Sequence, residues 1–181
     1  MVRVLVVGCR GTVPVSVIKS LKLVGGYEIH SADSNRYAPA LYLVKKRHLL
    51  PKYYENSYID KLEDVIQKEK IEAVIPCSDI LMHSIIEDFF KIDATIIAPE
   101  KEAVQTCLDK LAVYEFFDDH KIPCAETVLP ENADEIVKSK GFPIVVKRRF
   151  GSMKLGFAIC HNETELKVAL DTNEECPSKN I

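Results

Sequence analysis

The chain has 181 residues, of which 47% are hydrophobic and 28% are charged, a composition typical of a globular protein that can fill a core. The formal net charge of −3 argues against nucleic acid as the main partner. No apolar run approaches the roughly 20 residues of a membrane span, and Met1 opens the chain without a signal-peptide pattern. We therefore expect a cytoplasmic protein with no membrane partner.

Cysteines and histidines form no regular cluster in the sequence. The six cysteines include no CxxC pair, and the five histidines are scattered. We therefore expect reduced thiols, several of them buried as small hydrophobic side chains, and no zinc site or other metal site.

Strand patterns and helix patterns alternate along the first hundred residues. Short apolar or β-branched runs predict strands at Val2–Val7, Tyr27–Ala32, His48–Leu50, Ala73–Ile75 and Thr95–Ile97. Apolar stripes predict helices after Pro14, at about Ser57–Lys68 and from about Asp79. This alternation predicts a parallel sheet with helices on its faces, in which Val2–Val7 lies beside Tyr27–Ala32 and Ala73–Ile75.

A glycine turn follows the first strand. It reads Gly8-x-x-Gly11, Pro14 lies in the first turn of the following helix, and Asp33 ends the second strand. This layout is similar to a dinucleotide fingerprint, in which an anion sits at the helix N-terminus and the acid holds a ribose. The spacing is not GxGxxG, however, and a tight turn between strand and helix explains the same residues equally well.

The composition changes after Pro99. The pattern predicts one helix from about Lys101 through Asp109-Lys110 to Phe117, a strand at Glu126–Leu129 and a polar helix at Glu131–Lys140. Asn162 satisfies a glycosylation sequon, but Glu165 lies three residues further on, which predicts a helix N-cap instead.

A basic hairpin occupies residues 141–160. The apolar run Ile144-Val145-Val146 predicts a strand that delivers Lys147 at its end, and Phe157–Cys160 predicts a second strand. The loop between them carries Gly151, Ser152, Lys154 and Gly156. Glycines let backbone amides turn toward an anion and lysines supply positive charge, so a polyphosphate suits this loop. A surface hairpin whose basic residues face water is an equally good interpretation of the chemistry alone.

The order of these motifs resembles the front portion of ATP-grasp ligases, and most of all the relatives of the carbamoyl-phosphate synthase large subunit. The resemblance covers residues 1 to about 170 and rests on the GxxG turn, Asp33, Pro76-Cys77-Ser78-Asp79, Asp109-Lys110, IPCAET and FPIVVKRRFGSMKLG. It implies an α/β protein with a Rossmann-like pre-ATP-grasp domain, which has a parallel sheet, at residues 1–100. The first, incomplete lobe of an ATP-grasp fold is expected to follow at residues 101–181.

The resemblance also implies site residues and a reaction. The residues that would contact the phosphates of ATP are Lys110, Lys147, Gly151, Ser152, Lys154 and Gly156. Those that would border the substrate side are Gly8, Gly11, Asp33, Ser78 and Asp79. In the family reaction, ATP phosphorylates a small carboxylate to an acyl phosphate, which an amine or similar nucleophile then attacks. The loop departs from the family pattern, because Met153 and Leu155 stand where small residues are usual.

Magnesium is implied for the complete family domain, but in the family its ligands and the adenine-holding strand lie beyond the segment that matches this chain. We therefore assign this chain no metal ligand and no catalytic residue. A downstream region, a second polypeptide or a homo-oligomer is expected to complete the fold, and the chain alone is expected to show at best weak nucleotide binding and no ligase turnover. Two alternatives stay open: a non-catalytic binding or regulatory module, and a nicotinamide-dependent reductase that uses Gly8, Gly11 and Asp33.

Overall fold

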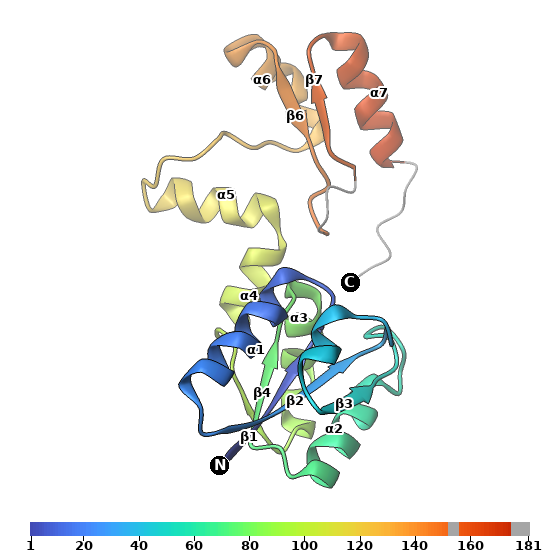
Figure 1. Cartoon of the computed structure of the whole chain (residues 1–181). Helices are drawn as coiled ribbons and strands as arrows, with labels where there is room; N and C mark the ends of the chain where they lie inside the picture. The colour runs from blue at the N-terminus through green and yellow to red at the C-terminus, as the bar shows by residue number, and fades with distance from the viewer. Residues whose placement is uncertain (152–155, 175–181) are drawn as a thin grey trace. The chain divides into compact units, whose positions relative to one another are not determined.

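The computed structural model describes residues 1–151 and 156–174. It divides into two compact units, Met1–Val104 and Gln105–Ile181, whose elements are labelled in Figure 1. Among the described residues, no helix combines the length and the apolar character that a membrane span requires.

The first unit is built on a five-stranded sheet with the strand order β3-β2-β1-β4-β5, in which every neighbouring pair is parallel. The strands are β1 (Val2–Val7), β2 (Tyr27–Asp33), β3 (Lys46–Leu49), β4 (Ala73–Pro76) and β5 (Thr95–Ile96). The prediction that β1 lies beside the second strand and the Ala73 strand is confirmed. Because β1 is central, Leu5, Val6 and Val7 are each at most 1% exposed.

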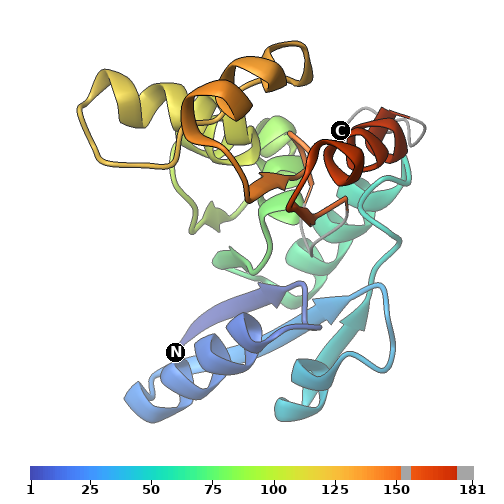
Figure 2. The ribbon, with the colours of Figure 1, turned by 90° about the horizontal axis from the view of Figure 1, so that it is seen from above.

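Helices cover both faces of this sheet. They are α1 (Thr12–Val24), α2 (Tyr58–Glu69) and α3 (Asp79–Glu87), with short 3-10 turns η1 (Pro39–Leu43) and η2 (Phe89–Lys91). Val6 packs with Ile18 of α1, whereas Leu5 and Val7 pack with Leu62 of α2, as the two-residue period of a strand requires. Figure 2 shows α1 on one side of the sheet and α2 on the other.

The third strand was predicted at residues 48–50 but runs from Lys46 to Leu49. It is an edge strand whose first two residues are exposed and charged, so the apolar pattern missed its beginning. The turn η1 was also missed, although Ala40 and Leu41 are buried against the α1 face of the sheet.

The second unit has fewer elements. Helix α4 (Lys101–Leu108) runs across the boundary between the units, and the remaining elements are α5 (Lys110–Asp119), η3 (Pro130–Asn132), α6 (Ala133–Lys140), β6 (Ile144–Val146), β7 (Ala158–Cys160) and α7 (Glu163–Glu174). The single helix predicted from Lys101 to Phe117 is wrong, because Asp109 adopts an extended backbone and caps a new helix. The strand predicted at Glu126–Leu129 is also wrong: the described sheet of this unit contains only β6 and β7.

The predicted hairpin and the last helix are confirmed. Strands β6 and β7 pair antiparallel, and a small core of Val146, Cys160, Leu166 and Ala169 lies beneath them. At the start of α7, the Asn162 side chain accepts a hydrogen bond from the Glu165 amide at 2.9 Å, while the Glu165 carboxylate accepts one from the His161 amide at 2.8 Å. This reciprocal capping fixes where α7 begins.

Candidate functional site

The carboxyl edge of the first sheet gathers the loops that follow β1 and β4. The amide of Gly8 donates to the Ala32 carbonyl at 3.0 Å, and the amide of Cys77 donates to the Val7 carbonyl at 2.8 Å. Gly8 has φ +88°, and a Cβ there would lie 2.5 Å from Cδ1 of Leu81 in α3. The two loops therefore lie on the same edge in close contact, where open α/β sheets bind ligands.

Asp33 fixes the glycine turn from inside. Its carboxylate accepts hydrogen bonds from the Cys9 amide at 2.7 Å, the Asn35 amide at 2.7 Å and Nε of Arg10 at 3.1 Å, and its side chain is only 4% exposed. Arg10 also donates to Oγ of Ser34 at 2.7 Å. Both carboxylate oxygens are thus engaged within the turn, which gives no support to a ribose-holding Asp33 and hence to the reductase alternative.

The other residues predicted for the substrate side are exposed. Ser78 caps α3, because its Oγ accepts a hydrogen bond from the Leu81 amide at 3.4 Å, and Asp79 follows in the first turn. Gly11 is also exposed, with no heavy atom within 4 Å of the position that a Cβ would occupy. Their role toward a substrate stays a prediction.

Two thiols at this edge are poor nucleophiles. Burial raises the pKa of Cys9 to about 12 and the pKa of Cys77 to about 11. Both are therefore protonated at neutral pH, and a thiolate mechanism at the carboxyl edge is disfavoured.

In the second unit, the β6–β7 sheet has one covered face and one open face. Val146 is 8% exposed and packs with Leu166 of α7, whereas Val145 is 50% exposed and pairs with Ile159 of β7, which is 52% exposed. Lys147, two residues after Val145, is exposed as well. Lys147 is the first residue after β6, so the exposed side chains of Val145 and Lys147 lie at the end of this strand.

Lys110 lies against the loop that follows β6. Its Nζ donates to the Gly151 carbonyl at 2.8 Å and to the Arg149 carbonyl at 3.4 Å, and its backbone amide donates to the same Arg149 carbonyl at 3.2 Å. The structure thus brings Lys110 next to Arg149 and Gly151, in the segment after β6. Whether both lysines meet one ligand stays a prediction.

Asp109 and Arg149 form an ion pair beside Lys110. Nε of Arg149 lies 2.8 and 2.9 Å from the two carboxylate oxygens of Asp109, and Nη2 lies 2.6 Å from Oδ2. The Arg149 guanidinium holds the pKa of the Asp109 carboxyl below its ordinary value, and the carboxylate in turn raises the pKa of Arg149. Sequence reasoning missed this pair, because nothing in the sequence signals a contact between residues 40 positions apart.

The far end of the loop is fixed at Gly156. It has φ +67°, and a Cβ there would approach Oδ1 of Asn173 and lie 2.8 Å from Cγ of Arg148. The Gly156 carbonyl also accepts a hydrogen bond from Nδ2 of Asn173 at 3.2 Å. The predicted phosphate contacts Ser152 and Lys154 lie outside the described residues.

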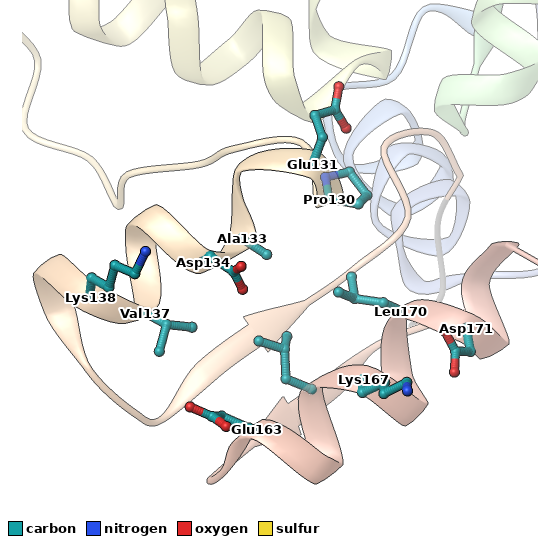
Figure 3. A pocket seen from close by; sticks show the side chains of 11 residues that line it. Pro130, Glu131, Ala133, Asp134, Val137, Lys138, Glu163, Lys167, Leu170 and Asp171 are labelled. Atoms are coloured by element: carbon teal, nitrogen blue, oxygen red, sulfur yellow. The ribbon is translucent and has the colours of Figure 1, made fainter.

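A cavity of about 730 Å³ lies between α6 and α7. Figure 3 shows Val137 and Leu170 in its lining, with the charged side chains of Lys138, Glu163 and Asp171 around them. None of the predicted site residues lines it. Across residues 1–151 and 156–174, no three histidine, cysteine or acidic side chains gather in a way that would hold a metal ion.

Comparison with known proteins identifies relatives of this chain. The family described as the PylC-like N-terminal domain matches residues 2–97. Formate-dependent phosphoribosylglycinamide formyltransferase of Sulfolobus acidocaldarius is 21% identical over 146 residues, which make up 78% of this chain and 35% of that enzyme.

Solved structures show the same fold. The biotin carboxylase domain of Hydrogenobacter thermophilus 2-oxoglutarate carboxylase, in complex with MgADP, ADP and bicarbonate, has a TM-score of 0.73 and 22% identity, covering 96% of this chain and 40% of that chain. N5-carboxyaminoimidazole ribonucleotide synthetase from Thermotoga maritima has a TM-score of 0.68 and 19% identity, covering 93% and 43%. This chain thus spans less than half the length of each of these relatives. It belongs to the PylC-like N-terminal domain family and has the fold of the N-terminal portion of ATP-grasp ligases.

Proposed function

We propose that this chain supplies the pre-ATP-grasp domain, residues 1–100, and the first nucleotide-binding lobe, residues 101–181, of an ATP-dependent carboxylate–amine ligase. The observation that carries the proposal is the open face of the β6–β7 sheet. The apolar side chains of Val145 and Ile159 are exposed there, and the exposed Lys147 comes directly after β6. Lys110 lies beside the loop that Lys147 introduces. A ligand with an apolar ring and a polyanionic tail matches this order of side chains.

The geometry supports a nucleotide that lies along β6. Two residues of a strand span about 7 Å, so one ligand can contact Val145 with its base and Lys147 with its phosphates. Lysine ammonium groups bind phosphate as compact point charges, and a charge-assisted hydrogen bond contributes about 1.5–3 kcal/mol. The remaining loop contacts, Gly151, Ser152, Lys154 and Gly156, complete the proposed phosphate site.

The reaction that we propose for the complete enzyme has two steps. A carboxylate oxygen of the substrate attacks the γ-phosphorus of ATP, the bond to the β–γ bridging oxygen breaks, and ADP leaves. An amine nitrogen then attacks the acyl carbon of the acyl phosphate, loses its proton, and inorganic phosphate leaves. The exposed residues Gly11, Ser78 and Asp79 at the carboxyl edge of the first sheet are proposed to border the carboxylate, together with Gly8 and Asp33.

Magnesium has no assigned ligands among the residues that the structure describes. The biotin carboxylase domain to which it is similar was solved with MgADP, but the described residues here offer no set of carboxylates for the metal. We therefore assign magnesium no ligand in this chain and propose that a downstream region or a second polypeptide, or assembly into a homo-oligomer, completes the active site. A cytoplasmic location is supported by the five free cysteines among the described residues.

The first test is nucleotide affinity. We expect the chain to bind ATP in an isothermal titration, and Lys147→Ala to weaken that binding about tenfold or more, since one charge-assisted contact is lost. Lys138→Ala removes an exposed lysine of α6 and serves as the matched control, with unchanged affinity expected. Equal ATP affinities for Lys147→Ala and the unsubstituted chain would mean that the Lys147 side chain faces water and does not contact the nucleotide. A parallel titration with NADPH should show no binding.

A second measurement addresses turnover. A phosphate-release assay with ATP, magnesium and a panel of carboxylates should detect no sustained activity, because one lobe cannot enclose and orient both reactants. The same assay without magnesium provides the background rate. Magnesium-dependent turnover by the 181-residue chain would show that it contains a metal site that we have not located.

A further inference from the structure

The ion pair between Asp109 and Arg149 occupies a position that the proposed nucleotide site does not explain. Asp109 is the N-cap of α5, where Oδ1 accepts hydrogen bonds from the Leu111 amide at 3.0 Å and the Ala112 amide at 3.4 Å. The same carboxylate receives three contacts of 2.6–2.9 Å from Arg149. A single side chain therefore ties the first turn of α5 to the segment after β6.

The backbone strengthens this connection around Lys110. The amide and the ammonium of Lys110 both donate to the Arg149 carbonyl, and the ammonium also donates to the Gly151 carbonyl at 2.8 Å. Residues 109 and 110 thus contact residues 149 and 151 through both side chains and one backbone amide. These contacts restrict the Lys110 ammonium, because a lysine side chain in solvent has many rotamers of similar energy.

We propose that Asp109 and Arg149 are positioning residues, which hold the Lys110 ammonium at the loop after β6 so that it meets the nucleotide phosphates together with Lys147. This inference rests on the proposed nucleotide site and extends it to two residues that do not touch the ligand. Arg149 is already satisfied by a carboxylate in a forked geometry, so its charge is offset before any phosphate arrives. Asp109 adds negative charge near the phosphates, yet improves binding through the placement of Lys110.

The proposal predicts that removing the negative charge of Asp109 weakens ATP binding, whereas electrostatic repulsion alone predicts that it strengthens it. Asp109→Asn removes a negative charge but keeps a good N-cap residue. If Arg149 were itself a phosphate ligand, this substitution would release it and tighten ATP binding. If the pair positions Lys110, Asp109→Asn weakens ATP binding, by about threefold to tenfold. Arg149→Lys, which keeps the charge but loses the fork, is expected to weaken it similarly.

A double-mutant cycle with Lys110→Ala separates positioning from a general structural role. When Lys110 is absent, Asp109→Asn should have no further effect on ATP affinity, measured by isothermal titration. Glu69→Gln, which removes a comparable exposed ion pair with Lys46 at 2.9 Å in the first unit, is the control and should change nothing. Additive effects of Asp109→Asn and Lys110→Ala, or tighter ATP binding by Asp109→Asn, would overturn the proposal.

A ligand-free measurement distinguishes this inference from the proposed function. In competitive labelling of lysine amines followed by mass spectrometry, Asp109→Asn should increase the labelling of Lys110 relative to Lys138 about threefold. Unchanged labelling would refute the positioning role even if ATP binds. Increased labelling in a chain that binds no ATP would refute the proposed function and, with it, the role of this positioning in nucleotide binding.

Discussion

The two units of this chain are held together in different ways. The first unit buries apolar side chains on both faces of a five-stranded sheet, including Leu5, Ile18 and Leu62 at 0% exposure. Among its described residues, the second unit has four buried residues in its core, and its segments are joined by polar contacts such as Asp109–Arg149 and Asn173–Gly156. Burial of apolar side chains therefore dominates in the first unit, whereas hydrogen bonds between distant residues contribute more in the second.

The largest expected effect is the loss of stability when a buried leucine in the core of either unit is truncated. Leu62→Ala should destabilise the first unit by about 2–5 kcal/mol, because the fully buried site in α2 leaves a cavity. Leu166→Ala in α7 is the matched substitution in the second unit, and its smaller surrounding core should put the cost near the low end, about 2 kcal/mol. Urea unfolding followed by NMR signals from each unit measures both. A larger loss of stability for Leu166→Ala than for Leu62→Ala would contradict the difference between the two cores.

An intermediate effect is expected where the first unit uses a polar contact of its own. Asp33→Asn removes the charge that binds the Cys9 amide and Arg10, so we expect a loss of about 1–3 kcal/mol and faster hydrogen exchange at the Cys9 amide. Asp79→Asn, at an exposed position on the same edge, should change stability by less than about 0.5 kcal/mol. Similar losses for the two variants would mean that Asp33 is not what fixes the turn.

The smallest effect is a difference in pH dependence. His30 and His48 stack with ring centroids 5.4 Å apart, and Glu28, Lys46 and Glu69 surround them. Burial lowers the pKa of both histidines below the ordinary 6.5, so below that value the unfolded chain binds more protons than the folded one. The stability of the first unit should therefore fall as the pH drops below about 6.5.

The ion pair of the second unit responds in a lower range. The pKa of Asp109 lies below its ordinary 3.8, so the stabilisation by Arg149 is present above that value and is lost as the pH falls further. Urea unfolding at pH 7, 6 and 5, followed by NMR signals from each unit, should show a loss in the first unit from these histidines and none in the second from Asp109. His48→Asn should reduce the loss in the first unit. Equal pH dependence in both units would contradict this assignment.

Prediction from sequence succeeded where burial is the cause of structure. The central strands and α1 to α3 follow from apolar periodicity, and the Asn162 cap follows from side-chain chemistry within three residues. Prediction failed at Lys46, because an edge strand needs few apolar residues. It also failed at Asp109, which lies among helix-forming residues but is the N-cap of a new helix.

The candidate site divides along the same line. The strand β6 and the position of Lys147 directly after it are readable from sequence, but the exposure of Val145 within that apolar run was not. The ion pair of Asp109 with Arg149 could not be predicted from the sequence, because a contact between residues 40 positions apart depends on the tertiary fold. The role of Asp33 in the turn was obscured by its similarity to a ribose-binding acid.

Gly8 affects what sequence variation in this family can reveal. Its positive φ favours glycine without any ligand present, and a Cβ there would also force the Leu81 side chain of α3 to shift. Substitutions of Gly8 are expected to destabilise the fold whether or not the turn binds a phosphate. A glycine at this position therefore reports on the backbone conformation and packing of the turn, and not on a ligand. Gly11 is different, because its φ is −93° and open space surrounds it. Intolerance of alanine at position 11 would therefore be informative about a bound molecule, and intolerance at position 8 would not.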